Sequence, residues 1–313
     1  MTYANTISKL SLVAYWSIGD SNVNGLEFSG FSMLKYVGLI LKNDTERNYF
    51  SSCFSGTGLT SIPQGLFDNC VKAFIFNNVF YSVPITSIPV GLFDHCTEAR
   101  EFKGAFEKTL LSSIPEDIFK YNVIASNFNL CFASTKITSV PERLFYYCSN
   151  AVVFGGFDNW GKAQGCFSRS LLESVPANLF INNKKASNFD GCFQYSKIKD
   201  LPAGLIDNCP VTAMNYFCNE CKMNSVVLPS ISSSLGRYSF DSLGFDLKYI
   251  ISNSAIPQTI ETTTFSNSNI YRYSIYVPDE SVDAYKTATN WTVLAGRIKP
   301  MSQFATDFPE EEI

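Results

Sequence analysis

The chain has 313 residues, of which 46% are hydrophobic, 15% aromatic and 17% charged, a composition typical of a folded protein rather than a disordered one. Its formal charge of -4 arises from 24 basic and 28 acidic residues, so no general positive field attracts nucleic acid, and we expect no nucleic-acid partner. No uninterrupted run of about 18 apolar residues occurs, which excludes a membrane-spanning helix of ordinary length.

The region 1–58 contains the apolar stretches KLSLVAYWSI and MLKYVGLILKN, which predict short β-strands separated by Gly and Ser. We expect this region to form a β-rich N-terminal cap, because the first unit of a repeat array otherwise exposes its apolar side chains. A role in attachment is the alternative. The sequence has no basic segment ahead of an apolar core at its start, so it does not resemble a secretory signal peptide.

An internal repeat occupies residues 59–272. Six copies open at Pro63, Pro89, Pro115, Pro141, Pro176 and Pro202, with gaps of 26, 26, 26, 35 and 26 residues. The fourth residue after the proline is Phe67, Phe93, Phe119, Phe145, Phe180 or Ile206, and the thirteenth is Phe76, Phe102, Phe128, Phe154 or Phe189. The sixth copy slips by one after Pro210, which places Ala213 and Tyr216 at its alanine and phenylalanine positions. Such a period predicts a solenoid, in which each unit buries its apolar face against its neighbours.

The ten cysteines follow the same repeat. The seventh residue after the proline is Cys70, Cys96, Asn122, Cys148, Asn183 or Cys209. A position that accepts Cys or Asn is better explained as a small buried slot than as a disulfide partner, so we expect the cysteines to be reduced. Cys218 and Cys221 have the CxxC spacing of redox and metal sites, but no second pair accompanies them, and we interpret them as part of a degenerate last repeat.

Within one repeat, the Ile-Pro or Val-Pro step predicts an extended residue followed by a short helical turn of five or six residues. The AxxF segment predicts one short strand, and the segment before the next proline predicts another. Pro229 and Pro257 continue the period with gaps of 27 and 28 residues, so the Ser-rich segment between them is interpreted as a further coil rather than a linker.

In the region 273–313, Pro278 predicts the start of a short VDAYK helix. The segments IYVP and RIKP lie on either side of it, and the resemblance described below implies that they are strands and that the region is a C-terminal cap. The end of the chain, FATDFPEEEI, is interpreted as a solvated acidic tail, with a docking peptide as the alternative. The predicted fold is therefore a repeat solenoid of short β-strands and short helical turns, closed by a cap at each end.

These strings carry a resemblance to a known family. The pattern LTSIPxxLFxxCxxAxxF resembles the type-5 leucine-rich repeats of BspA-like bacterial surface proteins, and residues 273–301 are similar to the segment that closes such proteins. The resemblance implies a leucine-rich-repeat fold and a non-enzymatic recognition or adhesion protein on a bacterial cell surface. Because no export signal is recognised, a virion structural component of a bacteriophage of gut bacteria, such as a head or tail fibre or a decoration protein, is the alternative.

One copy departs from the period by nine residues, since its gap is 35 rather than 26. The extra residues lie in GGFDNWGKAQG, from Gly155 to Gly165, where glycines at both ends let the chain leave and rejoin the coil. Phe157 and Trp160 lie between them. Exposed aromatic side chains on a loop raised from a rigid scaffold often supply binding energy, so both are candidate binding residues. The alternative is that both fold back over neighbouring coils.

A second candidate surface consists of variable residues beside the repeated strand phenylalanine. They are Arg100, Glu101, Lys103, Asn127, Asn129, Asn188 and Asp190. Solenoids bind partners through such faces, although solvated residues on a sheet show the same pattern.

Nothing in the sequence predicts catalysis. His95 is the single histidine, which excludes a histidine-based triad or a multi-histidine metal site within one chain. We therefore expect no enzyme activity, no cofactor and no metal. The expected partner is a protein or a surface glycan, with other virion subunits as partners in the alternative, and the expected location is a bacterial cell surface or a virion surface.

Overall fold

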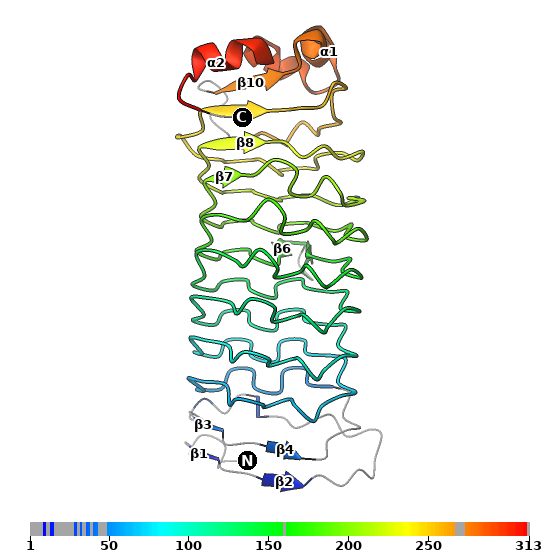
Figure 1. The fold of residues 1–313 in the computed structure, drawn as a ribbon. Helices are drawn as coiled ribbons and strands as arrows, with labels where there is room; N and C mark the ends of the chain where they lie inside the picture. Colours follow the sequence, from blue (N-terminus) through cyan, green and yellow to red (C-terminus); the bar gives the residue numbers. More distant parts are fainter. Residues whose placement is uncertain are drawn as a thin grey trace.

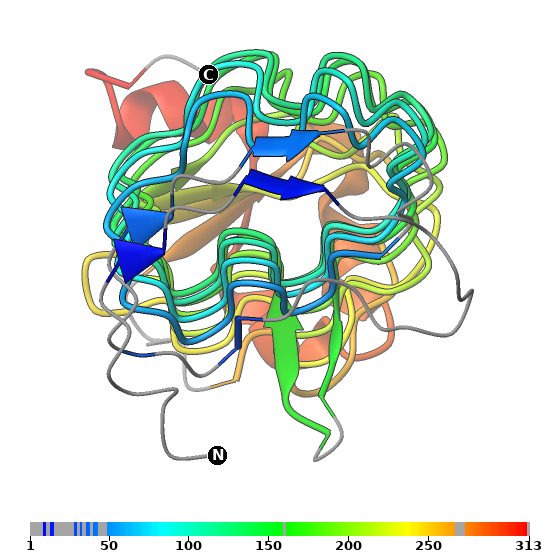
Figure 2. The same cartoon turned by 90° about the horizontal axis from the view of Figure 1, so that it is seen from below.

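The computed structural model describes residues 9–10, 13–15, 28–29, 32, 36–37, 40–42, 49–158, 161–266 and 273–311. Within these ranges the chain winds into a stack of coils, which ends at helices α1 (Val282–Thr287) and α2 (Phe304–Asp307) (Figure 1). Seen along the stack, successive coils follow nearly the same path (Figure 2). The predicted solenoid is therefore present.

Two columns of parallel backbone pairing join the coils. In the first column each coil contributes one residue to a ladder of bridges, formed by Tyr49, Ile75, Glu101, Asn127, Val153, Asn188 and Ala213. The second column runs through the residues that precede the prolines, where Lys136 N donates to Leu111 O at 2.8 Å. In most coils the first predicted strand is thus reduced to a single bridge, and the second to backbone hydrogen bonds without an assigned strand.

Toward the C terminus the second column widens into a five-stranded parallel sheet in the order β11-β10-β9-β8-β7. Its strands are β7 (Asp200–Leu201), β8 (Ser225–Val227), β9 (Tyr249–Ile251), β10 (Ser274–Val277) and β11 (Ile298–Pro300). Strands β8 and β9 pair in parallel within this sheet. The Ser-rich segment between them is therefore a further coil, as the spacing of the prolines predicted.

The segment after each proline is a series of tight turns, and the predicted helical turn is wrong. Asp68 N donates to Gly65 O at 3.2 Å and Cys70 N donates to Phe67 O at 2.9 Å, so each bond spans three residues. In four of the six copies the second residue after the proline has a positive φ, for example +72° at Gly65 and +59° at Asp117, whereas Arg143 and Asn178 at the same place do not. Where it occurs, this left-handed residue stops a helix from propagating.

Three columns of phenylalanine rings fill the core. They are Phe50, Phe76, Phe102, Phe128, Phe154 and Phe189; Phe54, Phe80, Phe106, Phe132, Phe167 and Phe193; and Phe67, Phe93, Phe119, Phe145 and Phe180. Neighbouring rings within a column stack with centroids 5.3 to 6.1 Å apart. Rings of the third column also meet rings of the first column edge-on, as Phe67 meets Phe76 at 5.1 Å. Each such pair adds roughly 0.5–1.5 kcal/mol to the burial term.

Residues at the seventh position after the proline donate hydrogen bonds to the preceding coil. Asn122 Nδ2 donates to the carbonyl oxygens of Phe93 at 3.3 Å and Cys96 at 2.8 Å, in the preceding coil. The thiol of Cys148 donates to Phe119 O at 3.8 Å in the same way. All ten cysteines are buried and none is paired in a disulfide, so the position holds small buried side chains as expected. Asn and Cys share the slot because both carry a donor.

The sixth copy is shortened by one residue, and the predicted direction of its slip is wrong. Ala213 pairs with Asn188 in the ladder, so Met214 takes the buried phenylalanine position, with 1% of its surface exposed. The missing residue lies beside Pro210, between the cysteine slot and the strand. As a consequence, Tyr216 lies outside the core, at a left-handed surface position with φ +57°.

The region 1–58 contributes strands at its described positions. β1 (Lys9–Leu10) pairs in parallel with β3 (Tyr36–Val37), and β2 (Val13–Tyr15) with β4 (Ile40–Lys42). Lys9 pairs with Tyr36, a separation of 27 residues, which is close to the period of the repeat. These strands lie ahead of residue 58, and their separation in the sequence is nearly that of neighbouring coils.

The last coil is covered by the segment between β10 and β11, which contains η1 (Asp279–Ser281), α1 and η2 (Thr292–Arg297). Trp291 is fully buried there, and its Nε1 donates to Gln258 O at 2.7 Å. Its ring meets Tyr285 of α1 edge-on at 4.9 Å. This segment follows the strand, helix and strand order that the sequence predicted.

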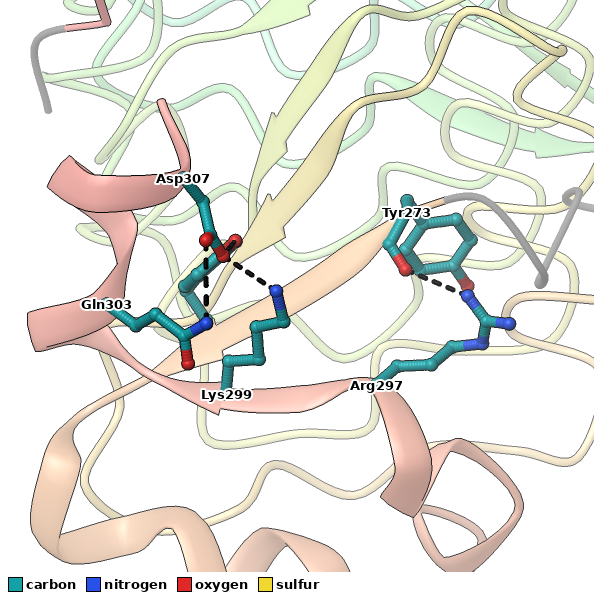
Figure 3. A network of polar contacts seen from close by, with 6 residues as sticks. Tyr273, Arg297, Lys299, Gln303 and Asp307 are labelled. Carbon is teal, nitrogen blue, oxygen red and sulfur yellow. Dashed lines mark hydrogen bonds and ion pairs between the residues drawn. The ribbon is translucent and has the colours of Figure 1, made fainter. Parts of the chain in front are cut away.

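The end of the chain folds back onto the sheet, which corrects the interpretation of a solvated tail. After η3 (Met301–Gln303), Phe304 of α2 is 1% exposed and meets Tyr249 and Tyr276 edge-on at 4.8 and 5.0 Å. Lys299 Nζ lies 2.7 Å from Asp307 Oδ2 (Figure 3). Aromatic side chains on the outer face of the sheet therefore give the tail an apolar surface to cover.

Two further contacts hold this end. Lys248 Nζ and Glu311 Oε1 lie 2.8 Å apart, and Arg297 Nη1 donates to Tyr273 O at 2.9 Å (Figure 3).

Candidate binding face

The nine-residue insertion forms a β-hairpin that projects from one side of the stack (Figure 2). Strand β5 (Gly155–Phe157) pairs antiparallel with β6 (Ala163–Gly165). At its base Cys166 N donates to Phe154 O at 2.8 Å, which closes the coil beneath the hairpin. The predicted departure and return of the chain are therefore confirmed.

The two ends of the insertion require glycine because the next coil passes close to them. A Cβ atom on Gly155 would lie 2.1 Å from Asp190 O, and one on Gly165 would lie 2.3 Å from Cys192 Cα. Backbone atoms cannot move aside as a flexible side chain can. Any larger residue at these positions would displace the hairpin or the coil.

Polar contacts join the two arms of the hairpin. Asp158 accepts hydrogen bonds from Lys162 N at 2.8 Å and from Gln164 Nε2 at 2.9 Å. Trp160 lies outside the described residues, so only Phe157 of the two aromatic candidates has a described position.

Phe157 is partly exposed on the hairpin and also contacts later coils. It therefore has features of both predicted arrangements, the exposed ring and the ring that folds back over neighbouring coils. Its side chain is 36% exposed, and its ring meets Tyr216 edge-on at 6.3 Å. The Arg237 guanidinium lies 5.7 Å from the Phe157 ring and 5.8 Å from the Tyr216 ring. Tyr216 also stacks on Tyr238 at 5.0 Å. We call these four residues the aromatic–arginine cluster.

The second predicted surface is partly formed. Glu101 and Asn127 occupy the bridge ladder on successive turns of the solenoid, and Asn188 follows after Val153. Asn127 Nδ2 donates to Glu101 Oε2 at 2.9 Å. Arg100 and Lys103 are exposed beside them. These five residues form a polar stripe that leads to the coil of the hairpin.

Asn129 and Asp190 are buried, with 7% and 3% of their surfaces exposed, and this corrects their placement on an open surface. Asp190 Oδ1 accepts hydrogen bonds from Asn215 N at 2.6 Å and Asn215 Nδ2 at 2.9 Å. Burial raises the pKa of the Asp190 carboxyl. Gly156 N donates to Asp190 O at 3.1 Å, so this residue supports the base of the hairpin. The alternation of buried and exposed residues along a strand does not show that the hairpin lies over Asn129 and Asp190.

Exposed basic side chains lie on the hairpin or on nearby coils. They are Lys103, Lys108, Lys162, Arg169 and Arg237. Lys108 Nζ lies 4.6 Å from the centroid of Tyr81, and the Arg169 guanidinium lies 5.1 Å from that of Tyr195. Together with the aromatic–arginine cluster, these side chains define what we call the basic–aromatic face.

The described residues contain no group of three or more His, Cys, Asp or Glu that could hold a metal ion. His95 is an exposed turn residue, while Cys218 and Cys221 are fully buried. Across the described part of the chain, no helix combines the length and the apolar character that crossing a bilayer demands.

Sequence reasoning missed Tyr216, Arg237 and Tyr238. The repeat pattern in the sequence assigned Tyr216 to the buried phenylalanine position of the sixth copy. Met214 takes that position in the structure, because the sixth coil is one residue shorter. Arg237 and Tyr238 lie in a Ser-rich segment whose register only the coil pairing shows, where Tyr216 N donates to Arg237 O at 2.9 Å. If the repeats had been aligned with Gly191 opposite Tyr216, then Tyr216, Arg237 and Tyr238 would all have been assigned to surface positions.

Comparisons with known proteins give weak similarities. No family model matches the chain, and no curated protein matches it. The leucine-rich repeat domain of APL1 aligns with a TM-score of 0.36 at 10% identity, over 82% of this chain and 75% of that chain. A chain of the Toll–Spatzle complex of Drosophila aligns with a TM-score of 0.24 at 9% identity, over 86% of this chain and 48% of that chain. Its glycosylated form gives 0.23 at 14% identity, over 80% and 37%. This chain spans less than half the length of the Toll complex chains, and at these scores the likeness says nothing about what it binds.

Proposed function

We propose that this protein is a non-enzymatic recognition protein of the leucine-rich-repeat kind, which binds a protein or a glycan through its basic–aromatic face. The observation that carries the proposal is the placement of Phe157. A closed hairpin lifts its ring from the solenoid, and Tyr216 and Arg237 from other coils hold the ring while 36% of the residue stays exposed. A preorganised aromatic side chain loses little conformational entropy on binding, which is why such residues dominate binding energies.

The test is a binding array of bacterial surface glycans and extracellular proteins, probed with the full chain and with two variants. Phe157→Ala removes the ring on the hairpin. Phe245→Ala is the matched control, since Phe245 is 78% exposed and lies outside the proposed face. We expect at least one array partner to lose binding about tenfold with Phe157→Ala and to be unaffected by Phe245→Ala. Equal effects of both variants, or no partner at all, would contradict the proposal.

The setting that we propose is a BspA-like adhesion protein exposed on a bacterial cell, and its support is the repeat pattern together with the closing segment at residues 273–301. A virion component is the alternative setting. Mass spectrometry of bacterial envelopes and of purified phage particles separates them. Peptides of this chain in envelopes alone support the cell surface, peptides in particles support the virion, and peptides in neither contradict both.

A further inference from the structure

We propose that the basic–aromatic face binds an acidic polysaccharide, a sugar chain on which carboxylates recur at regular distances. This inference rests on the proposed recognition function and names the chemical class of its ligand.

The charge of the face is the first observation. The whole chain has a formal charge of -4, yet five exposed cations lie on the hairpin or on nearby coils, as described above. Lys108 forms an ion pair with Glu107 at 3.7 Å, and Glu107 and Asp190 are buried, with 8% and 3% of their surfaces exposed. Glu101 is half-buried beside Lys103 and accepts a hydrogen bond from Asn127. Asp158 is engaged by the hairpin, and Glu220 is an exposed carboxylate on the same side. Four exposed basic side chains of the face form no ion pair with a described carboxylate: Lys103, Lys162, Arg169 and Arg237. Glu220 is the one exposed carboxylate named here, so the exposed charge of the face complements an anionic ligand.

The orientation of the arginines is the second observation. Arg169 lies over the ring of Tyr195, and Arg237 lies between Phe157 and Tyr216. A guanidinium held against an aromatic ring keeps the N–H groups at its edge free for a bidentate contact with a carboxylate. Neither arginine side chain forms an ion pair with another described residue. Both are thus prepared to pair with carboxylates of a ligand.

The regular spacing of the coils is the third observation. Arg169 N donates to Gln194 O and Tyr195 N donates to Asn219 O, and these bonds join consecutive coils. Arg237 lies one coil further along, so it is three coil steps from Arg169. At a separation of about 4.8 Å between paired strands, three steps amount to roughly 14 Å. An acidic sugar chain carries charged groups at regular intervals and can span such a distance. Its C–H faces can pack on exposed aromatic rings such as Tyr195, which is 43% exposed.

The backbone of the face argues against an extended peptide. Such a peptide gains most of its affinity from main-chain hydrogen bonds to an unpaired strand edge. On the coils of this face, main-chain groups already bond to the neighbouring coil, as Gly191 N does to Asn215 O at 2.8 Å and Tyr216 N to Arg237 O at 2.9 Å. A polysaccharide needs no main-chain partner.

The test measures binding by isothermal titration calorimetry with polygalacturonate and hyaluronan as the acidic polysaccharides. Methyl-esterified polygalacturonate keeps the sugar backbone without the charge, and poly-L-glutamate keeps the charge on a peptide. The variants are Arg169→Gln and Arg237→Gln. Arg143→Gln is the matched control, because Arg143 lies over a tyrosine ring at 5.2 Å but on the turn segment after Pro141, where it pairs with Asp117.

We expect at least one acidic polysaccharide to bind, with about tenfold weaker binding for each of Arg169→Gln and Arg237→Gln and no change for Arg143→Gln. Esterification should abolish binding. Equal binding of poly-L-glutamate or of the ester, an equal loss in Arg143→Gln, or no binding of either polysaccharide overturns the inference. If the array partner is then a protein or a neutral glycan that depends on Phe157, the proposed function stands and only the ligand class is wrong.

Discussion

Phe145 and Phe180 are 35 residues apart in the sequence, yet their rings stack with centroids 5.9 Å and planes 7° apart. Phe119 and Phe145, which are 26 residues apart, stack in the same way at 6.1 Å and 8°. The insertion therefore does not disturb the core, because the bond from Cys166 N to Phe154 O closes the coil beneath it. We therefore expect that the hairpin can be changed without unstacking these rings.

The first prediction concerns the stacked core. Phe145→Ala should lower the free energy of unfolding by about 3–5 kcal/mol, because the ring is fully buried between two others and its removal leaves a cavity. Phe245→Ala should change it by less than about 0.5 kcal/mol, since that side chain is 78% exposed. Urea unfolding followed by circular dichroism measures both. Similar losses for the two variants would show that the columns are not a packed core.

The second prediction concerns the donor in the small slot. Asn183→Ala should cost about 1–3 kcal/mol, because the buried carbonyls of Phe145 and Cys148 lose the donor that now lies 3.1 and 2.8 Å away. The adjacent Asn182→Ala is the control, since the bond of Asn182 to Tyr146 O is exposed. Asn183→Cys should retain more stability than Asn183→Ala. If the alanine variant is as stable as the cysteine variant, the slot requires only small volume and no donor.

The third prediction concerns the base of the hairpin. Gly165→Ala should lower the free energy of unfolding by about 1–3 kcal/mol, because its methyl group would meet the backbone of Cys192. Gly296→Ala is the control, since nothing lies within 4 Å of a Cβ there. Thermal unfolding of both variants tests the close approach of the two coils, and an unaffected Gly165→Ala protein would disprove it.

The fourth prediction concerns the pH dependence of stability through Asp190. Burial raises its pKa in the folded state, so the folded protein holds this proton more tightly than the unfolded chain does. Its contribution to stability is therefore lost as the pH rises from about 3.9, the usual Asp value, through the raised folded value. Asp190→Asn cannot ionise but still accepts hydrogen bonds from Asn215. The variant should gain stability relative to the wild type between pH 4 and pH 7, by urea unfolding at each pH; a constant difference would contradict this.

The repeat made the core predictable from the sequence. A residue type that recurs at a fixed distance from each proline must occupy an equivalent place in each coil, which is sufficient to assign Phe145 and Cys148 to buried columns. The glycines at the ends of the insertion were equally informative, because the chain can depart from a close-packed coil only where no side chain obstructs it.

The candidate face was less predictable, because it depends on relations between coils of unequal length. Tyr216 reaches the surface only because one residue is missing beside Pro210, and Asp190 is covered only because a hairpin arises from the adjacent coil. The turns after the prolines were mistaken for helical turns, because the pattern of buried positions is the same for both and the left-handed residue at Asp117 leaves no sign in it.

The most direct test of the account is to delete Gly156–Gln164, which restores the spacing from Pro141 to Pro176 from 35 to 26 residues. We predict that the thermal unfolding midpoint stays close to that of the full chain, while binding to the array partner falls at least about tenfold. Retained binding would contradict a recognition role for the hairpin, and loss of the folded state would contradict a core that is independent of the insertion.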